Sequence, residues 1–289
     1  MMCRVLRVAR ASFYRWRDRK DAAPTPRQIR HDQLVEAVIA AYEDAEGMAG
    51  RRQLTWMLNN NGVEVSESTV GTIMRDHGLR AIRTQTWKQT TVQDPQARTE
   101  HIENHMLDDY GNRDFSAEQP GTRLVGDITY LKTGQGWLYL ATVIDLCTGM
   151  VIGWNTANHI RTDLCIAALT MARDQGYVHP DQAVYHTDRG AQFTSKQFQA
   201  WCAGNGITQS MGSTGVCWDN SVAENWFSHF KTEFYHHHRF ATHRQAEAAI
   251  LDYIESWYNR RRPNERAGGQ APIQAWQDYF TSDQELLAA

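Results

Sequence analysis

Three acidic residues occupy positions where a carboxylate is costly or unusual, and they constrain this chain more than any other feature. Asp127 interrupts the apolar run from Leu124 to Leu131, which has the pattern of a buried strand. A carboxylate inside such a strand costs several kcal/mol unless it is paired or bound to a metal ion. Asp188 follows a second predicted strand, and Glu224 lies on a predicted helix. The three residues are therefore candidates for a metal site.

A hard divalent cation such as Mg²⁺ or Mn²⁺ offsets the cost of burying carboxylates by taking their oxygens as ligands. Two ions held by three carboxylates can activate a water or a 3′-hydroxyl and stabilise the leaving oxygen of a phosphodiester. Lys231 follows Glu224 by seven residues, so both side chains are expected on one helix face, with Lys231 near a DNA phosphate. The pattern predicts phosphoryl transfer on nucleic acid with two Mg²⁺ or Mn²⁺ ions.

Each of these residues also has an ordinary structural interpretation. Asp188 could be a turn aspartate, although open sheets place ligands at the carboxyl ends of their strands. Glu224 and Lys231 could both be solvated side chains on a helix surface. Spacing alone does not decide between these alternatives for Glu224 and Lys231.

The distribution of charge favours a DNA-binding front end. The net charge of the 289 residues is −3, but residues 1–100 carry a net charge of +4 and residues 101–289 carry −7. The first 35 residues alone carry +6. A basic front end joined to an acidic core fits DNA capture followed by metal-dependent chemistry. The alternative is an uneven surface without functional meaning.

Hydropathy and cysteine usage point to a cytoplasmic protein. No apolar run approaches the roughly 20 residues of a membrane span, and no signal peptide is recognisable at Met1. The 5 cysteines are odd in number and have no paired spacing. We therefore expect no membrane association, reduced thiols and a location in the cytoplasm.

The first part of the chain is expected to be helical. Residues 1–26 form a basic segment with two short helices, the second capped by Ser12. Residues 27–85 have the pattern of three helices with a tight turn before the last, which describes a helix-turn-helix domain. The third helix would enter a major groove, and Arg51 and Arg52 could contact phosphate. A helical packing domain with a solvated arginine pair is the alternative.

The central part of the chain is predicted to be an α/β core. Residues 86–120 lack periodicity and are assigned as a linker, residues 121–236 as the core and residues 237–289 as a helical extension. The predicted order of strands and helices is that of a ribonuclease-H-like fold with a mixed five-stranded sheet. The elements expected in the core are strands at 123–131, 137–145, 149–156, 183–186 and 207–210 and helices at 162–174 and 195–203.

Several further residues near the acidic positions are candidates for secondary roles. Asn220 and Asn225 flank Glu224 and could orient it or contact DNA. Trp218 could stack on an unpaired base. Asp145 is another acid in an apolar strand, and we interpret it as a turn-stabilising side chain rather than a metal ligand. The histidines at 236–238 lack cysteines or carboxylates at ligand spacing, so they are assigned to the surface rather than to zinc.

At this point a family resemblance is visible. The stretch GWLYLATVID at 136–145, followed by HTDRGAQFTS at 186–195, resembles the integrase core of bacterial insertion-sequence transposases. The chain is most similar to the second-frame product of the insertion-sequence-three family. The similarity extends from VARASFYRW at 8–16 to the tail with WYN at 257–259 and Pro272.

The resemblance implies a DDE-type polynucleotidyl transferase. It places the family's catalytic, metal-binding carboxylates on Asp127, Asp188 and Glu224 and its basic residue on Lys231. The enzyme would bind terminal inverted repeats, cleave a strand and transfer the 3′-hydroxyl to target DNA, as a homo-oligomer on DNA. The family also implies a companion first-frame protein, often joined to this chain by ribosomal frameshifting.

Two positions depart from the family pattern. Leu124 to Gly126 fill a stretch where a tryptophan is common, and Asn264 stands where histidine is frequent. These differences concern local packing rather than the metal chemistry. The competing functions are a non-catalytic DNA-binding regulator and a nuclease, either one derived from a decayed element.

Overall fold

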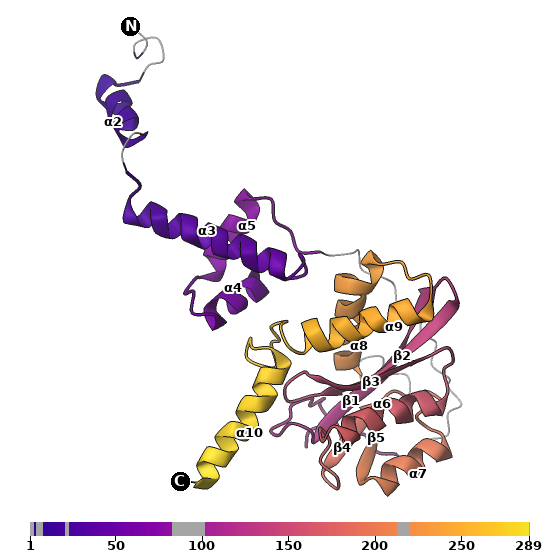
Figure 1. Cartoon of the computed structure of the whole chain (residues 1–289). Helices are drawn as coiled ribbons and strands as arrows, with labels where there is room; N and C mark the ends of the chain where they lie inside the picture. Colours follow the sequence, from indigo (N-terminus) through magenta and orange to yellow (C-terminus); the bar gives the residue numbers. More distant parts are fainter. Residues whose placement is uncertain (1–2, 4–7, 21–22, 83–101, 213–219, 289) are drawn as a thin grey trace.

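The computed structural model describes residues 3, 8–20, 23–82, 102–212 and 220–288. Figure 1 shows an N-terminal helix, a small bundle of helices and an α/β body that carries the C-terminal helices. Within the described residues, no helix is long and apolar enough to cross a lipid bilayer. The predicted fold class is confirmed by these elements and by their order along the chain.

The N-terminal helix α2 comprises Arg10–Lys20. The prediction that Ser12 caps it was wrong. The amide of Phe13 already donates to the carbonyl of Ala9 at 3.1 Å, so the first helical turn begins before Ser12. Trp16 on this helix is 59% exposed, so α2 leaves a large part of this aromatic side chain in solvent.

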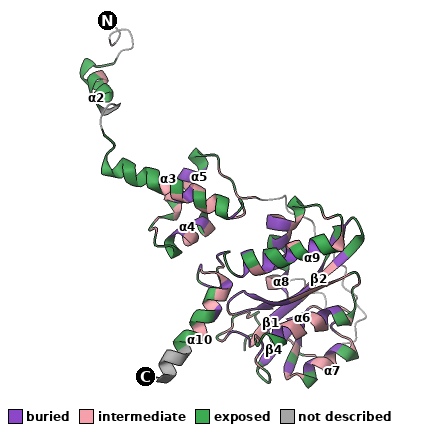
Figure 2. Ribbon diagram, viewed as in Figure 1, coloured by how far each residue is buried: buried purple, intermediate pink, exposed green. Residues whose placement is uncertain are grey.

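Three helices form the helix-turn-helix bundle, as predicted: α3 (Pro26–Asp44), α4 (Arg51–Asn60) and α5 (Glu67–Asp76). Thr25 and Gln28 form a reciprocal capping box at the start of α3, and Ser66 caps α5. Gly78 adopts φ +69° just after α5, a conformation that glycine adopts without steric cost. The bundle buries the inner faces of its helices, while much of α3 remains exposed (Figure 2).

The core contains a mixed five-stranded sheet in the order β3-β2-β1-β4-β5. Its first three strands are an antiparallel meander, and β4 and β5 are parallel to β1 and to each other. Strand β1 pairs with β4 over Arg123–Val125, so the residues that follow on β1 lie just past this parallel ladder. The strands are β1 (Arg123–Thr133), β2 (Gly136–Asp145), β3 (Val151–Ala157), β4 (Ala183–Thr187) and β5 (Ile207–Met211).

Helices cover both faces of this sheet. On one face α6 (Thr162–Asp174) packs against β2 and β3, and α7 (Lys196–Gly204) packs against β5. On the other face α8 (Ser221–His229) packs against β1 and continues into the π-helical segment η1 (Phe230–Phe234). The remaining helical segments are η2 (Tyr235–His237), α9 (His243–Leu251), η3 (Asp252–Tyr258) and α10 (Pro272–Ala288).

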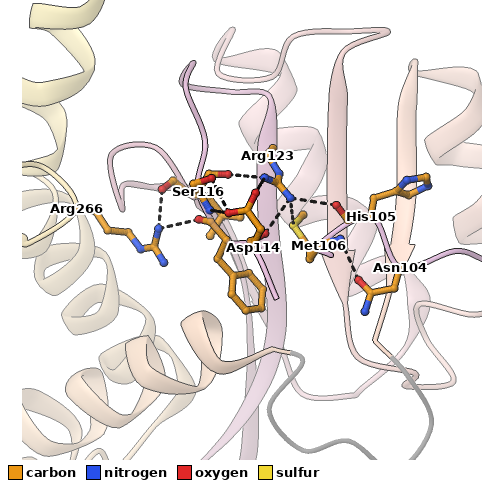
Figure 3. A network of polar contacts seen from close by, with 9 residues as sticks. Asn104, His105, Met106, Asp114, Ser116, Arg123 and Arg266 are labelled. Atoms are coloured by element: carbon orange, nitrogen blue, oxygen red, sulfur yellow. Dashed lines mark hydrogen bonds and ion pairs between the residues drawn. The ribbon is translucent and has the colours of Figure 1, made fainter. Parts of the chain in front are cut away.

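The segment before the sheet is held to its β5 edge. The backbone amide of Met211 donates to the carbonyl of Glu103 at 3.1 Å, and the amide of His105 donates to Ser210 Oγ at 2.9 Å. The guanidinium of Arg123 donates to Asp114 and to the carbonyl of His105, as Figure 3 shows. The described part of the predicted linker, 102–120, therefore lies against the core, whereas 83–101 lie outside the described residues.

A buried ion pair fastens the C-terminal extension to η1. Arg262 Nε and Nη2 donate to the two carboxylate oxygens of Glu233 at 2.8 and 2.6 Å, and both side chains are only 8% exposed. Burial alone would raise the pKa of Glu233, but hydrogen bonds from Arg262 and His229 lower it to about 2. The pair is therefore charged at neutral pH and holds η1 against the extension.

We expect Arg262→Ala to lower the free energy of unfolding by about 3–5 kcal/mol, because it leaves the Glu233 carboxylate buried without its partner. Arg260→Ala is the matched control, since Arg260 lies in the same basic run but is exposed, and it should cost less than about 0.5 kcal/mol. Urea unfolding of the two variants measures both values. Equal losses would contradict the structural role of the buried pair.

Candidate active site

Asp127 lies on β1 at the point where the parallel ladder with β4 has ended. Its side chain is half-buried, and its Oδ1 accepts a hydrogen bond from the amide of Ile128 at 2.7 Å. The preceding residue must be glycine, because a Cβ at Gly126 would overlap the ring hydroxyl of Tyr185. The close packing of Tyr185 against Gly126 thus fixes the backbone that presents Asp127.

Asp188 directly follows Thr187, the last residue of β4. Its Oδ1 accepts a hydrogen bond from the amide of Gly190 at 3.0 Å, which orients the side chain within the turn. Because β4 is parallel to β1, its carboxyl end points to the same edge of the sheet as the part of β1 that carries Asp127. The topology therefore brings these two carboxylates together.

Glu224 lies in the first turn of α8 and is exposed. The helix start is tied to β1 by Asn220, whose Nδ2 donates to the carbonyl of Gly126 at 2.9 Å. Asn220 is 6% exposed and is the N-cap residue of α8. This contact joins the residue before Asp127 to the helix that carries Glu224, so the structure places Asn220 between two of the predicted carboxylates.

The pKa values show that the three carboxylates interact. Burial raises the pKa of Asp127 well above its ordinary value, and the negative charges of Asp188 and Glu224 raise it further. Burial also raises the pKa of Asp188. Partial burial raises the pKa of Glu224, and the charge of Asp188 adds to this. Negative charge is therefore concentrated at the edge of the sheet where β1, β4 and α8 meet.

Lys231 lies beside this group of carboxylates. Burial lowers the pKa of its ammonium, and the charge of Asp127 opposes that change. Its Nζ is 5.3 Å from the centre of the Tyr130 ring. The residue belongs to the π-helical segment η1 rather than to an uninterrupted α-helix. The charge of Lys231 nevertheless interacts with Asp127, so its ammonium lies near that carboxylate.

The donor set of the site fits a hard divalent cation. Asp127, Asp188 and Glu224 offer carboxylate oxygens only, which Mg²⁺ and Mn²⁺ prefer over soft metals. In the parts of the chain that the structure describes, no three His, Cys, Asp or Glu side chains lie close enough together to hold one ion. The mutual repulsion of the three carboxylates opposes a closer approach, and bound cations would remove that repulsion.

The two predicted arginines lie on α4 of the helix-turn-helix bundle, away from the carboxylates. Arg51 pairs with Glu67 at 2.8 Å, and Arg52 pairs with Glu265 at 2.9 Å, so both contribute to exposed ion pairs around α4. Asn225 is exposed on α8. Trp218 lies outside the described residues. The predicted DNA contacts are therefore divided between the front bundle and the start of α8.

Two minor predictions are confirmed. Asp145 is fully buried and accepts hydrogen bonds from the amides of Gly121 and Thr148, both at 2.8 Å. It therefore stabilises a turn, as expected, and does not face the other carboxylates. The histidines at 236–238 are exposed, in agreement with their assignment to the surface.

The sequence did not reveal the contacts that hold the helix-turn-helix bundle and the C-terminal extension together. The segment after η3 contacts α3 and α4 through polar groups on both sides. In the sequence, only the basic run at 260–262 indicated an ionic contact, and it did not indicate which acidic residue would pair with it. The contacts are Arg261 with Asp44, Arg52 with Glu265, and Asn60 Nδ2 with the carbonyl of Gly269 at 3.0 Å.

The chain is similar to known protein families and to curated proteins. The Integrase core domain family matches residues 117–217, and a second family of the same description matches residues 224–277. The HTH-like domain family matches residues 30–86. The transposase InsF for insertion sequence IS3A of Escherichia coli (strain K12) is 35% identical over 273 residues, which are 94% of this chain and 92% of that protein.

A second relative, the transposase for insertion sequence element IS629 of Shigella sonnei, is 28% identical over 97% of this chain and 92% of its own. A chain of the simian T-cell lymphotropic virus intasome in complex with PP2A regulatory subunit B56 gamma is 16% identical, with a TM-score of 0.46, over 82% of this chain and 73% of that one. The HTLV-2 integrase catalytic core domain in complex with magnesium is 17% identical, with a TM-score of 0.43. The match covers 55% of this chain and 98% of that one.

The fold, the family matches and the full-length relatives define the protein as a DDE-type transposase with an integrase core and a helix-turn-helix domain. More particularly, the chain belongs to the IS3 family of insertion-sequence transposases.

The repulsion between the carboxylates should make the metal-free site a source of instability. Because the folded pKa of Asp127 lies above its ordinary value of 3.8, the native state loses stability as pH rises from about 4 through that raised pKa. We expect Asp127→Asn to raise the free energy of unfolding at neutral pH by about 0.5–2 kcal/mol without metal. Added Mg²⁺ should stabilise the wild type and have little effect on the variant.

Thermal melts at acidic and neutral pH, with and without Mg²⁺, measure these differences. Asp145→Asn is the matched control, since Asp145 is also an acid in an apolar strand but is hydrogen-bonded by Gly121 and Thr148. That variant should lose stability and keep the response to Mg²⁺. A Mg²⁺ response in Asp127→Asn equal to that of the wild type would contradict the assignment of Asp127.

Proposed function

We propose that Asp127, Asp188 and Glu224 are the catalytic and metal-binding residues of this transposase, with two Mg²⁺ or Mn²⁺ ions as the cofactor. The observation that carries the proposal is that carboxylates on β1, at the end of β4 and at the start of α8 lie at one edge of the sheet. Burial raises the pKa of all three, and the charge of Asp188 raises the pKa of Asp127 and Glu224 further, although the described side chains are not close enough together to hold one ion as they stand. When bound, the ions activate the attacking hydroxyl and stabilise the leaving oxygen of the phosphodiester.

The protein's own residues position these groups and the DNA strand. Asp127, Asp188 and Glu224 would hold the ions through their carboxylate oxygens. Asn220 holds the start of α8 against β1 through its hydrogen bond to Gly126, so Glu224 stays within reach of the aspartates. Lys231 supplies positive charge beside Asp127 and holds a DNA phosphate there. Charge stabilisation and positioning account for such catalysis without a covalent enzyme intermediate.

DNA recognition is assigned to the helix-turn-helix bundle. Its third helix, α5, is proposed to enter the major groove of the terminal inverted repeats. Arg51 and Arg52 lie at the exposed start of α4 and can exchange their surface ion pairs for DNA phosphates, because such pairs contribute little stability. Asn225 on α8 is proposed to contact the DNA near the cleavage site.

The assembly is proposed to be larger than one chain. We propose a homo-oligomer on DNA that engages both element ends and the target DNA. A companion first-frame protein, supplied separately or as a frameshift fusion with this chain, completes end recognition. The complex would act on the nucleoid in the cytoplasm. A nuclease shares the same carboxylates, but it would cleave end DNA without joining it to a target.

We expect Asp188→Asn to reduce strand cleavage and strand joining to background while end-DNA binding changes by no more than a few fold. The substitution keeps the size of the side chain but removes charge that holds the cations, whereas the DNA contacts come from other residues. The assay uses labelled element-end DNA, a target duplex, Mg²⁺ or Mn²⁺ and the companion protein.

Asp174→Asn is the matched control, because Asp174 is an exposed aspartate at the end of α6 that pairs with Arg173. It should leave cleavage and joining unchanged. Equal product from wild type and Asp188→Asn would remove Asp188 from the active site. Cleavage without joining by the wild type would favour the nuclease, and binding without cleavage would favour the non-catalytic regulator.

A further inference from the structure

Two large aromatic side chains are exposed side by side on the β1–β2 hairpin. Tyr130 and Trp137, called here the aromatic pair, are 46% and 49% exposed. Their ring centres are 5.2 Å apart and their planes are at 90°. A perpendicular contact leaves at least one face of each ring uncovered by the other ring. Tyr130 lies three residues after Asp127 on the same strand.

Lys231 links the aromatic pair to the site. Its Nζ lies 5.3 Å from the centre of the Tyr130 ring, and its charge interacts with Asp127. One ammonium therefore lies between the exposed aromatic surface and the carboxylates. Positive charge next to an aromatic face is the combination by which proteins hold single-stranded nucleic acid, the charge on phosphate and the ring on a base.

The hairpin that carries the aromatic pair is held firmly. Tyr235 Oη accepts a hydrogen bond from the amide of Lys132 at 2.6 Å and donates to its carbonyl at 3.0 Å. At the hairpin tip, the amide of Gly134 donates to the carbonyl of Phe240 at 2.8 Å. These contacts fix the backbone on which Tyr130 lies, so the aromatic surface is formed before any ligand arrives.

Stabilisation of the hairpin is the ordinary role of a cross-strand aromatic pair. That role does not require about half of each ring to remain in water or a lysine from η1 to reach over Tyr130. It also does not account for the position of the pair next to a lysine whose charge interacts with Asp127. A role in binding DNA accounts for the exposure, the charge and the position together.

We propose that the aromatic pair stacks an unpaired nucleobase of the DNA end that is being cleaved. The proposal rests on the carboxylates being the active site. In this proposal the terminal base pairs of the element open as the scissile phosphate approaches Asp127. The opened base loses its stacking in the duplex, and stacking on an aromatic side chain replaces it, an exchange worth roughly five- to hundredfold in binding. Lys231 holds the adjoining phosphate.

The test compares cleavage of two element-end duplexes by the full-length protein with its companion protein. One duplex is fully paired, and the other carries mismatches at the terminal positions, so its bases are already open. The combined variant Tyr130→Leu with Trp137→Leu should cleave the paired duplex about 10- to 100-fold more slowly than wild type. On the mismatched duplex the variant should cleave within about threefold of the wild-type rate. The terminal bases of this duplex are already unpaired, so stacking on the aromatic pair is no longer needed to offset the cost of opening them.

Tyr130→Phe keeps the ring and should cleave the paired duplex like wild type. Tyr110→Leu is the matched control, since Tyr110 is an 89% exposed tyrosine on the segment before the sheet, and it should have no effect on either duplex. Equal loss on both duplexes would show structural damage and overturn the proposal, as would wild-type rates for the double variant on the paired duplex. Failure of wild type to cleave either duplex would instead count against the catalytic assignment.

Photo-crosslinking provides a second measurement that does not depend on the folding of a variant. Duplexes with 5-iodouracil at each terminal position in turn are bound to the wild-type protein, irradiated and digested. The proposal predicts a crosslink at one terminal position to Tyr130 or Trp137. Crosslinks that map only to other parts of the chain would overturn it.

Discussion

The candidate active site depends on placing a carboxylate on the central strand of the sheet, where burial makes it costly. Asp127 lies on a central strand, half-buried, and burial raises the pKa of its side chain more than its charged neighbours do. Proteins accept such a cost at functional sites, where stability is exchanged for a charged, positioned group. Two neighbouring residues fix the backbone at this position. Gly126 has no Cβ, which leaves room for Tyr185 to pack against the strand, and Asn220 attaches α8 to the same backbone through a hydrogen bond.

The C-terminal extension stabilises the helix that completes the site. Glu224 and Lys231 lie on the continuous run of α8 and η1, which the buried pair of Glu233 and Arg262 joins to the extension. The same extension contacts the helix-turn-helix bundle through Arg52 and Glu265. The element that supports the active site is thus also in contact with the domain assigned to DNA recognition.

The features that local patterns encode could be predicted from the sequence. The apolar runs indicated five strands close to their observed bounds, and the interruption of one run by Asp127 pointed to the site by local pattern alone. The helix from 162 to 174 was predicted to the residue, because its apolar spacing is regular and Gly176 follows it. The turn role of Asp145 was recognised for the same reason, since its position at a strand end is a local feature.

Features that depend on distant partners could not be predicted. Asn220 bonds a carbonyl 94 residues away, and Arg262 pairs with a carboxylate 29 residues away, and no spacing rule connects either pair. The π-helical segments η1 and η3 were not predicted either, and Glu224 and Lys231 were expected on one uninterrupted helix. The early start of α2 shows that Ser12 is equally compatible with a position inside a helix.

The central claim is that Asp127, Asp188 and Glu224 hold cations at one place. Fe²⁺ can substitute for Mg²⁺ at oxygen-ligand sites, and with ascorbate and peroxide it cleaves the polypeptide next to its ligands. Bound to element-end DNA, the protein should be cut near residues 127, 188 and 224 together, and excess Mg²⁺ should suppress all three cuts in parallel. Cuts at only one of these positions, or cuts that Mg²⁺ does not suppress, would contradict a shared metal site.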